Sequence, residues 1–272
     1  IQKVRQEWED QIHQKKEALE TQALNEKLEK DWIDVTKTYP IQKGNLHPMS
    51  KVQRRVEEIF TSMGFAIADG PEVDTEWNNF DALNIPSTHP ARDMQDTFWV
   101  NSKNDDPKKN SVLRTQTSDV QIREMQSHGA PIRIIVPGRV FRNEDVDASH
   151  DAVFYQVEGL MVDEGISLAH LKGTIETMLS ELFERETHVR FRPGYFPFVE
   201  PGLEVDFSCA LCGGKGCRVC KNTGWIEFMG AGMVHPNVLR NCDVDPEKYS
   251  GFAFGFGLTR LVMMKYEIDD IR

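Results

Sequence analysis

The chain has 272 residues and a formal net charge of −11 at pH 7. This length suffices for one large hydrophobic core, or for one core with an appendage. An acidic chain is not typical of a protein that binds nucleic acid by itself, so a nucleic-acid partner would need a local basic patch or another subunit. The sequence has neither an 18-residue apolar run nor a signal peptide, which argues against a membrane-bound or secreted protein.

The ends and the cysteines of the chain are both informative. The sequence begins with Ile1 rather than methionine and stops at Arg272 in a charged run, so we expect a fragment trimmed at both ends. Five cysteines, four of them clustered, favour a reducing cytoplasm and a metal site over a disulfide framework.

Residues 1–31 contain no Gly or Pro and predict a long amphipathic helix. Val4, Trp8 and Ile12 begin an apolar stripe at helical spacing, which continues to Leu28. An ordinary surface helix packed on its own domain is one interpretation of this stripe. Residues 34–45 read as a linker, so we expect an arm over 1–34 and one domain over 35–272.

The next hundred residues predict alternating helices and strands. His47-Pro48 opens a helix over 49–63, and a short strand over 65–68 ends at Gly70-Pro71. Another strand is expected over 96–100, followed by an exposed polar insertion over 101–111. Ser118 is well placed as the N-cap of a helix over 119–125, which need not exclude a substrate role.

Residues 137–159 are the most informative stretch, because they predict two strands joined by a long polar loop. The first strand carries Arg142 and Glu144, two residues apart. The returning strand carries three residues at the same spacing, Phe154, Gln156 and Glu158. Side chains alternate across a strand, so each set points to one face. Such a polar face is expensive to bury, and the apolar run leading into it favours a functional face over a solvated face with chance charges.

The following segment supplies packing elements and an aromatic pair. Residues 166–188 predict an amphipathic helix that we assign only to packing, and a strand begins over 189–191. Phe196, Phe198 and Glu200 then alternate, so we expect them on one face.

The cysteine cluster predicts a zinc site. Cys209 and Cys212 form one Cys-x-x-Cys pair, Cys217 and Cys220 form another, and glycines between them permit tight turns. Four protein ligands leave no open position, so the zinc would be structural rather than catalytic, with free buried thiols as the alternative. Cys242 stands alone and is expected to be a small buried residue.

The end of the chain predicts a strand over 225–228 and then a strand that runs into a helix over 250–261. Gly255 and Gly257 would let the backbone approach a nucleotide. Arg260 lies in the first turn of the helix, where phosphates are favoured by the helix N-terminus.

Three of these segments together resemble the class II aminoacyl-tRNA synthetases. Residues 141–144, Phe-Arg-Asn-Glu, with the returning strand at 154–159, resemble motif 2, and Gly255 to Arg260 resemble the Gly-x-Gly-x-x-Arg of motif 3. The helix and strand before Gly70 resemble the weaker motif 1. From about His47 to Arg272 the chain is similar, within that class, to the family of bacterial phenylalanyl-tRNA synthetase alpha subunits.

The resemblance implies a fold and a reaction. The expected fold is α+β: an antiparallel sheet flanked by helices, with an N-terminal coiled-coil helix and a zinc-knuckle insertion. The expected reaction is ATP-dependent activation of phenylalanine to its adenylate, with release of diphosphate and transfer of the amino acid to tRNA(Phe). The expected catalytic residues are Arg142, Glu144 and Arg260.

The resemblance also implies the binding residues. ATP would contact Arg142, Glu144, His150, Phe154 and Arg260. Phenylalanine would contact Trp99, Gln116, Ser118, Gln121, Gln156, Glu158, Phe196, Phe198 and Ala253. Glu200 is the candidate ligand for Mg²⁺, which hard carboxylate oxygens suit. Zn²⁺ would be structural.

The partners implied are a larger beta subunit, in an α2β2 heterotetramer, and tRNA(Phe), on which the N-terminal arm would lean. Two other functions stay open. A class II paralogue could bind an amino acid without charging tRNA, although such relatives usually lose a motif arginine and both Arg142 and Arg260 are present. A zinc-knuckle nucleic-acid module is the third possibility, but the acidic charge and the single knuckle argue against it.

Overall fold

The computed structural model describes residues 2–30, 44–87, 97–100, 104–143, 151–209, 212–218, 220–266 and 268. The chain divides into two compact units, Ile1–Asn45 and Leu46–Arg272. Among the described residues, no helix combines the length and the apolar character needed to cross a membrane.

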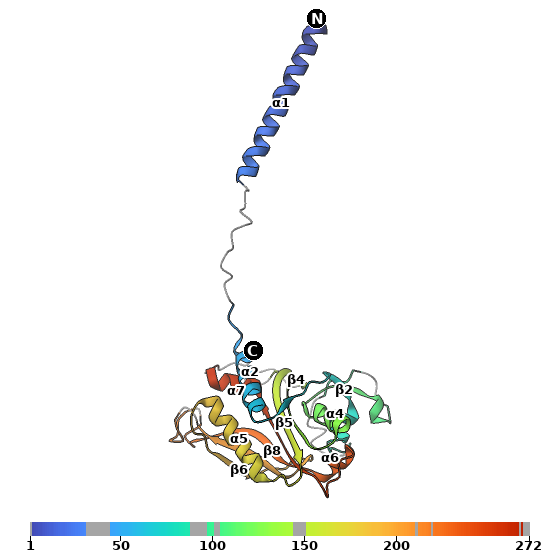
Figure 1. The fold of residues 1–272 in the computed structure, drawn as a ribbon, viewed down its shortest axis with the longest axis vertical. Coiled ribbons are helices and arrows are strands. Elements are labelled where there is room, and N and C mark those ends of the chain that lie inside the picture. Colours follow the sequence, from blue (N-terminus) through green and yellow to red (C-terminus); the bar gives the residue numbers. More distant parts are fainter. Residues whose placement is uncertain are drawn as a thin grey trace. The chain divides into compact units, whose positions relative to one another are not determined.

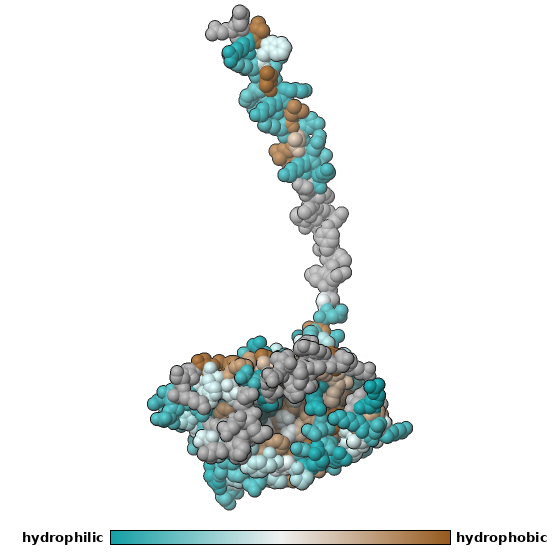
Figure 2. Space-filling view, turned by 180° about the vertical axis from the view of Figure 1, so that it is seen from behind, coloured by the Kyte–Doolittle hydropathy of each residue, from teal (hydrophilic) through white to brown (hydrophobic). Residues whose placement is uncertain are grey.

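The first unit contains the predicted long helix, α1 (Gln2–Lys30). Its apolar stripe is exposed along the helix, as the brown side chains in Figure 2 show. The exposed members are Val4, Trp8, Ile12, Leu19, Leu24 and Leu28. The predicted linker falls mostly on residues outside those the structure describes.

The second unit is built on a sheet that has seven strands in the described part of the chain (Figure 1). Their order across the sheet is β1 (Ala66–Ile67), β4 (Ile132–Phe141), β5 (Val153–Asp163), β9 (Ser250–Gly257), β8 (Trp225–Val234), β7 (Val199–Ser208) and β6 (Val189–Pro193). β1 pairs with β4 in parallel, and every other neighbouring pair is antiparallel. The α+β class expected from the sequence is confirmed.

Helices cover both faces of this sheet. On one face lie α2 (Pro48–Ser62), α5 (Leu168–Phe183) and α7 (Leu258–Tyr266). On the other face lie η1 (Trp77–Asp81), α4 (Ser118–His128) and α6 (Pro236–Asn241). A small second sheet pairs β2 (Val73–Thr75) with β3 (Ser111–Leu113), and the 3-10 turn η2 (Pro107–Lys109) precedes β3.

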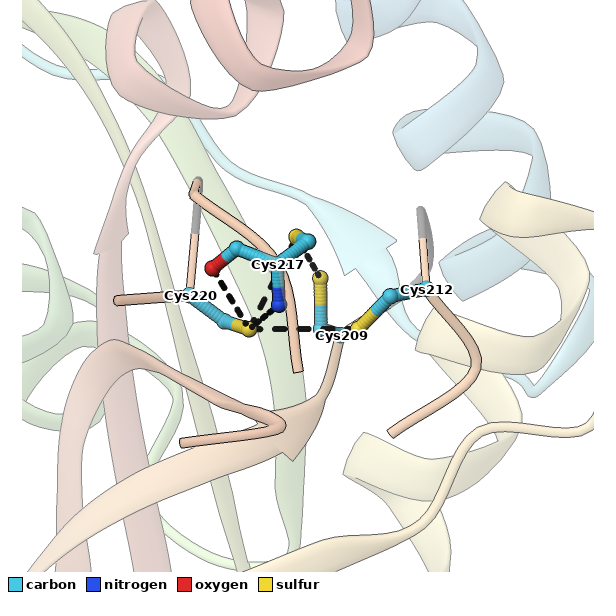
Figure 3. Close-up of side chains that lie close together, drawn as sticks. All are labelled: Cys209, Cys212, Cys217 and Cys220. Carbon is cyan, nitrogen blue, oxygen red and sulfur yellow. Dashed lines mark hydrogen bonds between the residues drawn. The ribbon is translucent and has the colours of Figure 1, made fainter. Parts of the chain in front are cut away.

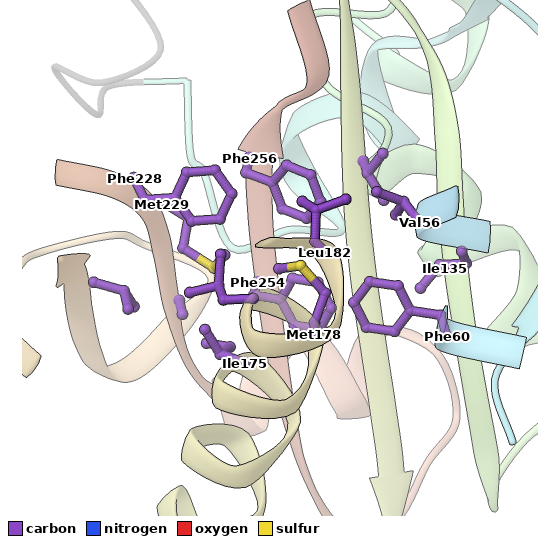
Figure 4. Close-up of a cluster of buried hydrophobic side chains, with 14 of the residues drawn as sticks. Val56, Phe60, Ile135, Ile175, Met178, Leu182, Phe228, Met229, Phe254 and Phe256 are labelled. Atoms are coloured by element: carbon purple, nitrogen blue, oxygen red, sulfur yellow. The ribbon is translucent and has the colours of Figure 1, made fainter. Parts of the chain in front are cut away.

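The core is split by the sheet because neighbouring residues of a strand point to opposite faces. In β4, Ile135 packs under α2 and α5, whereas Ile134 and Val136 pack on the side of α4. In β9, Phe254 and Phe256 join the first cluster, where Figure 4 shows them beside α5. This alternation leaves the other face of β5 and β9 free to carry polar side chains.

Several element boundaries differ from those the sequence predicts. The strand expected over 96–100 is wrong for residues 97–100, where the structure has a single bridge between Trp99 and Val112. β4 ends at Phe141, so Arg142 follows the strand instead of lying in it. The helix expected to reach residue 188 ends at Phe183. The last of these endings reflects Glu184, which adopts a left-handed conformation that closes the helix.

The N-cap of α4 was also predicted wrongly. Thr117 is the cap residue, and Ser118 is the first residue of the helix. The Ser118 hydroxyl instead donates a hydrogen bond to the buried carboxylate of Glu158. An unpaired buried carboxylate is costly, so it takes the hydroxyl that a cap would otherwise use.

Candidate active site

A cavity of about 340 Å³ opens on the polar face of β5 and β9. Four of the elements around it supply most of the predicted amino-acid contacts. Ser118 and Gln121 come from α4, with Gln116 just before it. The other predicted contacts in its wall are Gln156 and Glu158 of β5, Ala253 of β9, and Phe196 and Phe198 of the segment before β7. Residues that lie more than 100 positions apart in the sequence are therefore brought together in one cavity.

Glu158 is the best-buried charged group of the cavity wall, with 6% of its surface exposed. Its carboxylate accepts hydrogen bonds from the Thr117 backbone N–H at 3.0 Å, from the Gln121 amide at 3.2 Å and from the Ser118 hydroxyl. Burial raises the pKa of Glu158, against the lowering effect of the hydrogen bonds from Ser118 and Thr117 and of the charge of Arg142. The hydrogen bonds thus fix the orientation of the carboxylate, and a cation beside it would further stabilise its charged form.

Gln156 lies two residues before Glu158 on the same face of β5. Its Oε1 atom is buried and accepts no hydrogen bond from any described residue. A buried acceptor without a donor costs free energy of about 1–3 kcal/mol. The pair of acceptors formed by Gln156 and Glu158 therefore suits a ligand that carries several N–H donors.

Arg142 lies at the polar side of the cavity, just after β4. Its Nε donates to the Thr115 carbonyl at 3.2 Å, and its Cζ lies 5.1 Å from the centre of the Phe154 ring. The guanidinium therefore lies over the same aromatic ring that is predicted to contact ATP. A cation in this position can bind an anionic group at the mouth of the cavity.

The other end of the cavity is apolar. The rings of Phe196 and Phe198 stack with centroids 5.9 Å apart and an interplanar angle of 27°. Sequence reasoning missed most of the remaining apolar wall, which includes Leu83, Ile85, Met125, Leu160, Val234 and Val238. The sequence does not mark these residues, because an apolar residue that lines a cavity cannot be distinguished by its type from one that fills a core.

Of the residues predicted to contact ATP, phenylalanine or Mg²⁺, four lie outside the cavity wall and two more lie outside the described residues. Trp99, Phe154, Glu200 and Arg260 do not line this cavity. Arg260 is exposed in the first turn of α7, next to the end of β9. Glu200 is also exposed, and its carboxylate lies 3.3 Å from Nε2 of His235. Glu144 and His150 fall in the part of the chain that the structure does not describe.

The four clustered cysteines converge between β7 and β8 (Figure 3). The Sγ–Sγ distances are 3.8 Å for Cys209–Cys217, 3.8 Å for Cys212–Cys220 and 3.7 Å for Cys217–Cys220. Sulfurs bound tetrahedrally to zinc at about 2.3 Å lie about 3.8 Å from one another. The thiols therefore fit a zinc ion at their centre, and Cys242 is buried apart from them.

Backbone N–H groups around the thiols favour the ionised form that binds metal. Cys220 Sγ accepts from the N–H of Cys217 at 3.0 Å and of Gly224 at 3.3 Å, and Cys212 Sγ accepts from Gly216 at 3.2 Å. Desolvation opposes ionisation of Cys220, but these hydrogen bonds and the neighbouring thiols lower its pKa to about 6.

A second set of buried charges lies beneath α4 and was also missed by sequence reasoning. Asp74 of β2 accepts from Arg123 at 2.6 and 2.7 Å and from Asn78 at 2.8 Å. The carboxyl oxygens of Asp119 have no hydrogen-bond partner among the described residues, and burial raises the pKa of Asp119 well above its usual range. This cluster holds α4 against β2, behind the helix surface that faces the cavity.

Comparison with known proteins identifies the family. Residues 32–272 match the model of the tRNA synthetases class II core domain (F). A phenylalanine–tRNA ligase alpha subunit from Caldicellulosiruptor saccharolyticus is 52% identical over 265 residues, which cover 97% of this chain and 76% of that protein. The chain belongs to the phenylalanine–tRNA ligase alpha subunits, a family of class II tRNA synthetases. The alpha subunit of Ectopseudomonas mendocina is 55% identical over the same shares of the two chains.

Solved structures agree on the fold of this family member. Pyrrolysyl-tRNA synthetase from Desulfitobacterium hafniense matches with a TM-score of 0.58 and 19% identity, over 82% of this chain and 71% of that chain. At this identity the match supports the class II fold alone. The sequence-based assignment to a class II synthetase, and to this family within it, is confirmed.

Proposed function

We propose that this chain is the catalytic subunit that activates phenylalanine with ATP and transfers it to tRNA(Phe). One observation carries the choice of substrate: the cavity joins an apolar aromatic end to a buried pair of acceptors, Gln156 Oε1 and the Glu158 carboxylate. An amino acid with an uncharged ring places its ammonium group on the acceptors and its ring between Phe196, Phe198 and Ala253. The substrate ring then contacts the rings of Phe196 and Phe198 in the edge-to-face or offset-stacked arrangements that aromatic pairs prefer.

The ammonium site is set up by the neighbours of Glu158. Thr117, Ser118 and Gln121 use their donors on Glu158, which keeps the carboxylate in one orientation. The substrate ammonium supplies the positive charge that this carboxylate lacks. Its N–H groups also satisfy Gln156. Binding therefore depends on both the charge and the number of donors of the α-amino group.

The first reaction joins the substrate carboxylate to the α-phosphorus of ATP. A carboxylate oxygen donates its electron pair to the phosphorus, the bond to the bridging oxygen breaks, and diphosphate leaves with that electron pair. No proton has to move, because the nucleophile is already ionised. Catalysis is then a matter of positioning and of stabilising charge, as in phosphoryl transfer generally.

Arg142 is the residue we assign to that charge. It lies beside the cavity mouth and over Phe154, so it can contact the substrate carboxylate and the α-phosphate together while adenine stacks on the ring. Arg260 at the start of α7 is assigned to the terminal phosphate, where the helix N-terminus adds a favourable field. Glu144 and His150 remain proposed ATP contacts.

Two metal ions belong to the proposal. Glu200, an exposed carboxylate, is the candidate ligand of Mg²⁺, which neutralises phosphate charge when it is bound with ATP. Zn²⁺ would be held by Cys209, Cys212, Cys217 and Cys220 as a structural ion. The near-tetrahedral spacing of the sulfurs supports this assignment.

The proposed assembly is an α2β2 heterotetramer, because the relatives are named as alpha subunits and therefore imply a beta partner. The proposed location is the cytoplasm. The alternative, a paralogue that binds an amino acid without charging tRNA, is less well supported. Both motif arginines are present, and Arg142 lines the cavity and lies over the ring of Phe154.

Phenylalanine-dependent exchange between ATP and radioactive diphosphate tests the proposal. The chain is purified with its beta subunit and supplied in turn with phenylalanine, tyrosine and leucine. We expect exchange with phenylalanine well above that with the other two, and charging when tRNA(Phe) is added. Phenylalanine binding without exchange would support the paralogue instead.

A further inference from the structure

The ring of Phe196 lies against three glycines that are far apart in the sequence. A Cβ atom built on Gly230 of β8 would lie 3.0 Å from Cζ of that ring. One on Gly194 would lie 3.2 Å from Cε2, and one on Gly202 of β7 would lie 3.3 Å from Cδ2. These distances are shorter than ordinary van der Waals contacts, so only hydrogen atoms fit beneath the ring. The ring therefore rests directly on the backbone.

Gly230 is the position where this contact is simplest. The three atoms nearest to its hypothetical Cβ all belong to the Phe196 ring. By contrast, a Cβ on Gly202 would meet the carbonyl oxygen of Gly194 at 2.4 Å, and one on Gly194 would meet Glu204 at 3.0 Å. Gly230 lies in regular strand and is not among the glycines with positive φ. Space for the ring, and not backbone conformation, is what requires glycine there.

A neighbouring glycine has the same relation to another residue of the cavity wall, Glu158. Gly255 of β9 pairs directly with Gly230, so the two share one face of the sheet. A Cβ on Gly255 would lie 3.0 Å from Cγ of Glu158. Two adjacent glycines thus let two wall residues of the cavity lie flat on the sheet, the aromatic one and the acidic one.

We propose that Gly230 is a specificity-determining residue, which sets the width of the amino-acid cavity by fixing the depth of the Phe196 ring. The inference rests on the proposed function, since it takes phenylalanine as the occupant of the cavity. Gly230 acts through Phe196 and has no chemical role of its own.

A methyl group at Gly230 leaves the ring only one direction in which to move. Gly194 and Gly202 lie against other parts of the ring, and Phe198 stacks beside it at 5.9 Å. The remaining side faces the cavity, which contains no protein atoms to resist the movement. Since interiors are close-packed, the ring moves into the cavity by a few tenths of an ångström or more, and the cavity narrows.

The test compares Gly230→Ala with the parent, each purified with the beta subunit, in amino-acid-dependent ATP–diphosphate exchange. We expect KM for phenylalanine to rise about 10-fold or more, because one methyl group in a binding pocket changes discrimination by that order. KM for ATP should not change. Para-fluorophenylalanine, which is slightly larger, should lose more kcat/KM than phenylalanine. A general loss of folding would instead change KM for both substrates or reduce the amount of active enzyme.

Two further variants identify the cause. In a Phe196→Leu background, the added methyl meets no ring, so Gly230→Ala should have little further effect on KM for phenylalanine. Gly173→Ala in α5 is the matched control, because nothing lies within 4 Å of its hypothetical Cβ, and it should match the parent.

Each outcome of these measurements either supports the role of Gly230 or overturns it. A parent without phenylalanine-dependent exchange contradicts the proposed function and the inference with it. An active parent with an unchanged KM and unchanged preference in Gly230→Ala overturns the inference alone. If Gly230→Ala does not fold but the double variant does, the contact with Phe196 is the cause and the proposal holds. If neither folds, the methyl acts elsewhere and the proposal is wrong.

Discussion

Two contacts help to hold Arg142 in position, one with the Thr115 carbonyl and one with the face of the Phe154 ring. Both contacts place the guanidinium in the wall of the cavity. A fixed cation in this position needs no rearrangement when negative charge shifts in the reaction, which is the condition for strong electrostatic stabilisation.

We expect Arg142→Ala to abolish activation while folding survives. Loss of one such donor costs on the order of 3 kcal/mol of transition-state stabilisation, so kcat for ATP–diphosphate exchange should fall by more than about 100-fold. Arg139→Ala is the matched control, since Arg139 is exposed on β4 and pairs with Glu72 at 2.7 Å. A near-normal exchange rate for Arg142→Ala would show that Arg142 does not take part in activation and that the active site lies elsewhere.

Ala253 should control access of para-substituted rings. It lies in the cavity wall on β9, and the apolar wall can reject a larger ring only through lack of room. Ala253→Gly is expected to improve kcat/KM for para-chlorophenylalanine relative to phenylalanine by about 10- to 100-fold. Ala253→Val should exclude even phenylalanine.

Aminoacylation with both amino acids measures this effect. Ala169→Gly, at an exposed position of α5, controls for the general effect of a new glycine. If the ratio is the same in Ala253→Gly and the parent, Ala253 does not form the floor of the cavity.

At the scale of elements, the four cysteines connect the ends of two long strands. Cys209 directly follows β7, and Cys220 precedes β8 by a few residues. The opposite ends of these strands reach the cavity, at Val199 and Val234. A metal bound by the cysteines would therefore hold the two strands together at the ends that lie away from the cavity.

We expect removal of zinc to lower stability with only indirect effects on activation. Metal analysis should find one zinc per chain in the parent and none in Cys217→Ser, and the melting temperature should fall in the variant. Cys242→Ala is the control, because Cys242 is buried away from the cluster and should keep the metal. A fully metal-free enzyme with the parent's melting temperature would refute the structural role.

The ion pair between Asp74 of β2 and Arg123 of α4 should make the stability of the protein depend on pH in the acid range. Desolvation acts to raise the pKa of Asp74, but hydrogen bonds from Arg123, Asn78 and Thr75 outweigh it and hold the pKa below its usual range. A carboxylate with a lowered pKa in the folded state stabilises that state above the pKa of the unfolded chain, about 4. This contribution is lost as the pH falls through the lower folded-state pKa.

Asp74→Asn should therefore cost about 2 kcal/mol of unfolding free energy at pH 7, with the difference shrinking below about pH 4. Urea unfolding of the two proteins between pH 3 and 7 measures it. Glu72→Gln breaks an exposed ion pair and should cost less than about 1 kcal/mol at any pH. A constant difference between Asp74→Asn and the parent across this range would exclude the ion pair as its source.

At the scale of the whole molecule, the chain contains two units that differ in how much apolar surface they bury. Every described side chain of α1 from Val4 onward is exposed, whereas the second unit encloses two apolar clusters of its own. The first unit therefore contributes little buried area, and the second should fold by itself.

Deletion of residues 1–45 should leave ATP–diphosphate exchange intact when the rest of the chain is paired with the beta subunit. Charging of tRNA(Phe) should weaken, mainly through a higher KM for tRNA, if the arm contacts RNA as the family resemblance implies. Equal KM values for tRNA before and after the deletion would show that the arm has another task. Thermal unfolding of the shortened protein provides the control for folding.

The sequence by itself determined the class of fold, the family and the thiol cluster. Each depends on patterns within a short stretch: the alternation in 153–159, the Gly-x-Gly that ends at Gly257, and the spacing of two Cys-x-x-Cys pairs. Local spacing is enough here because strand alternation and metal geometry act over a few residues. The helix starting after His47 was likewise predictable, since its cap and its apolar face are local.

Only the tertiary structure decided how the cavity is enclosed and which donors hold Glu158. Ser118 gave its hydroxyl to Glu158, 40 residues away, and Thr117 became the cap of α4 instead. Leu83 and Val238 joined one apolar wall, and Gly230 came to lie beneath Phe196. Local propensity carries no information about such partners. The need to satisfy a buried carboxylate and to pack a ring on the sheet arises only once the chain is folded.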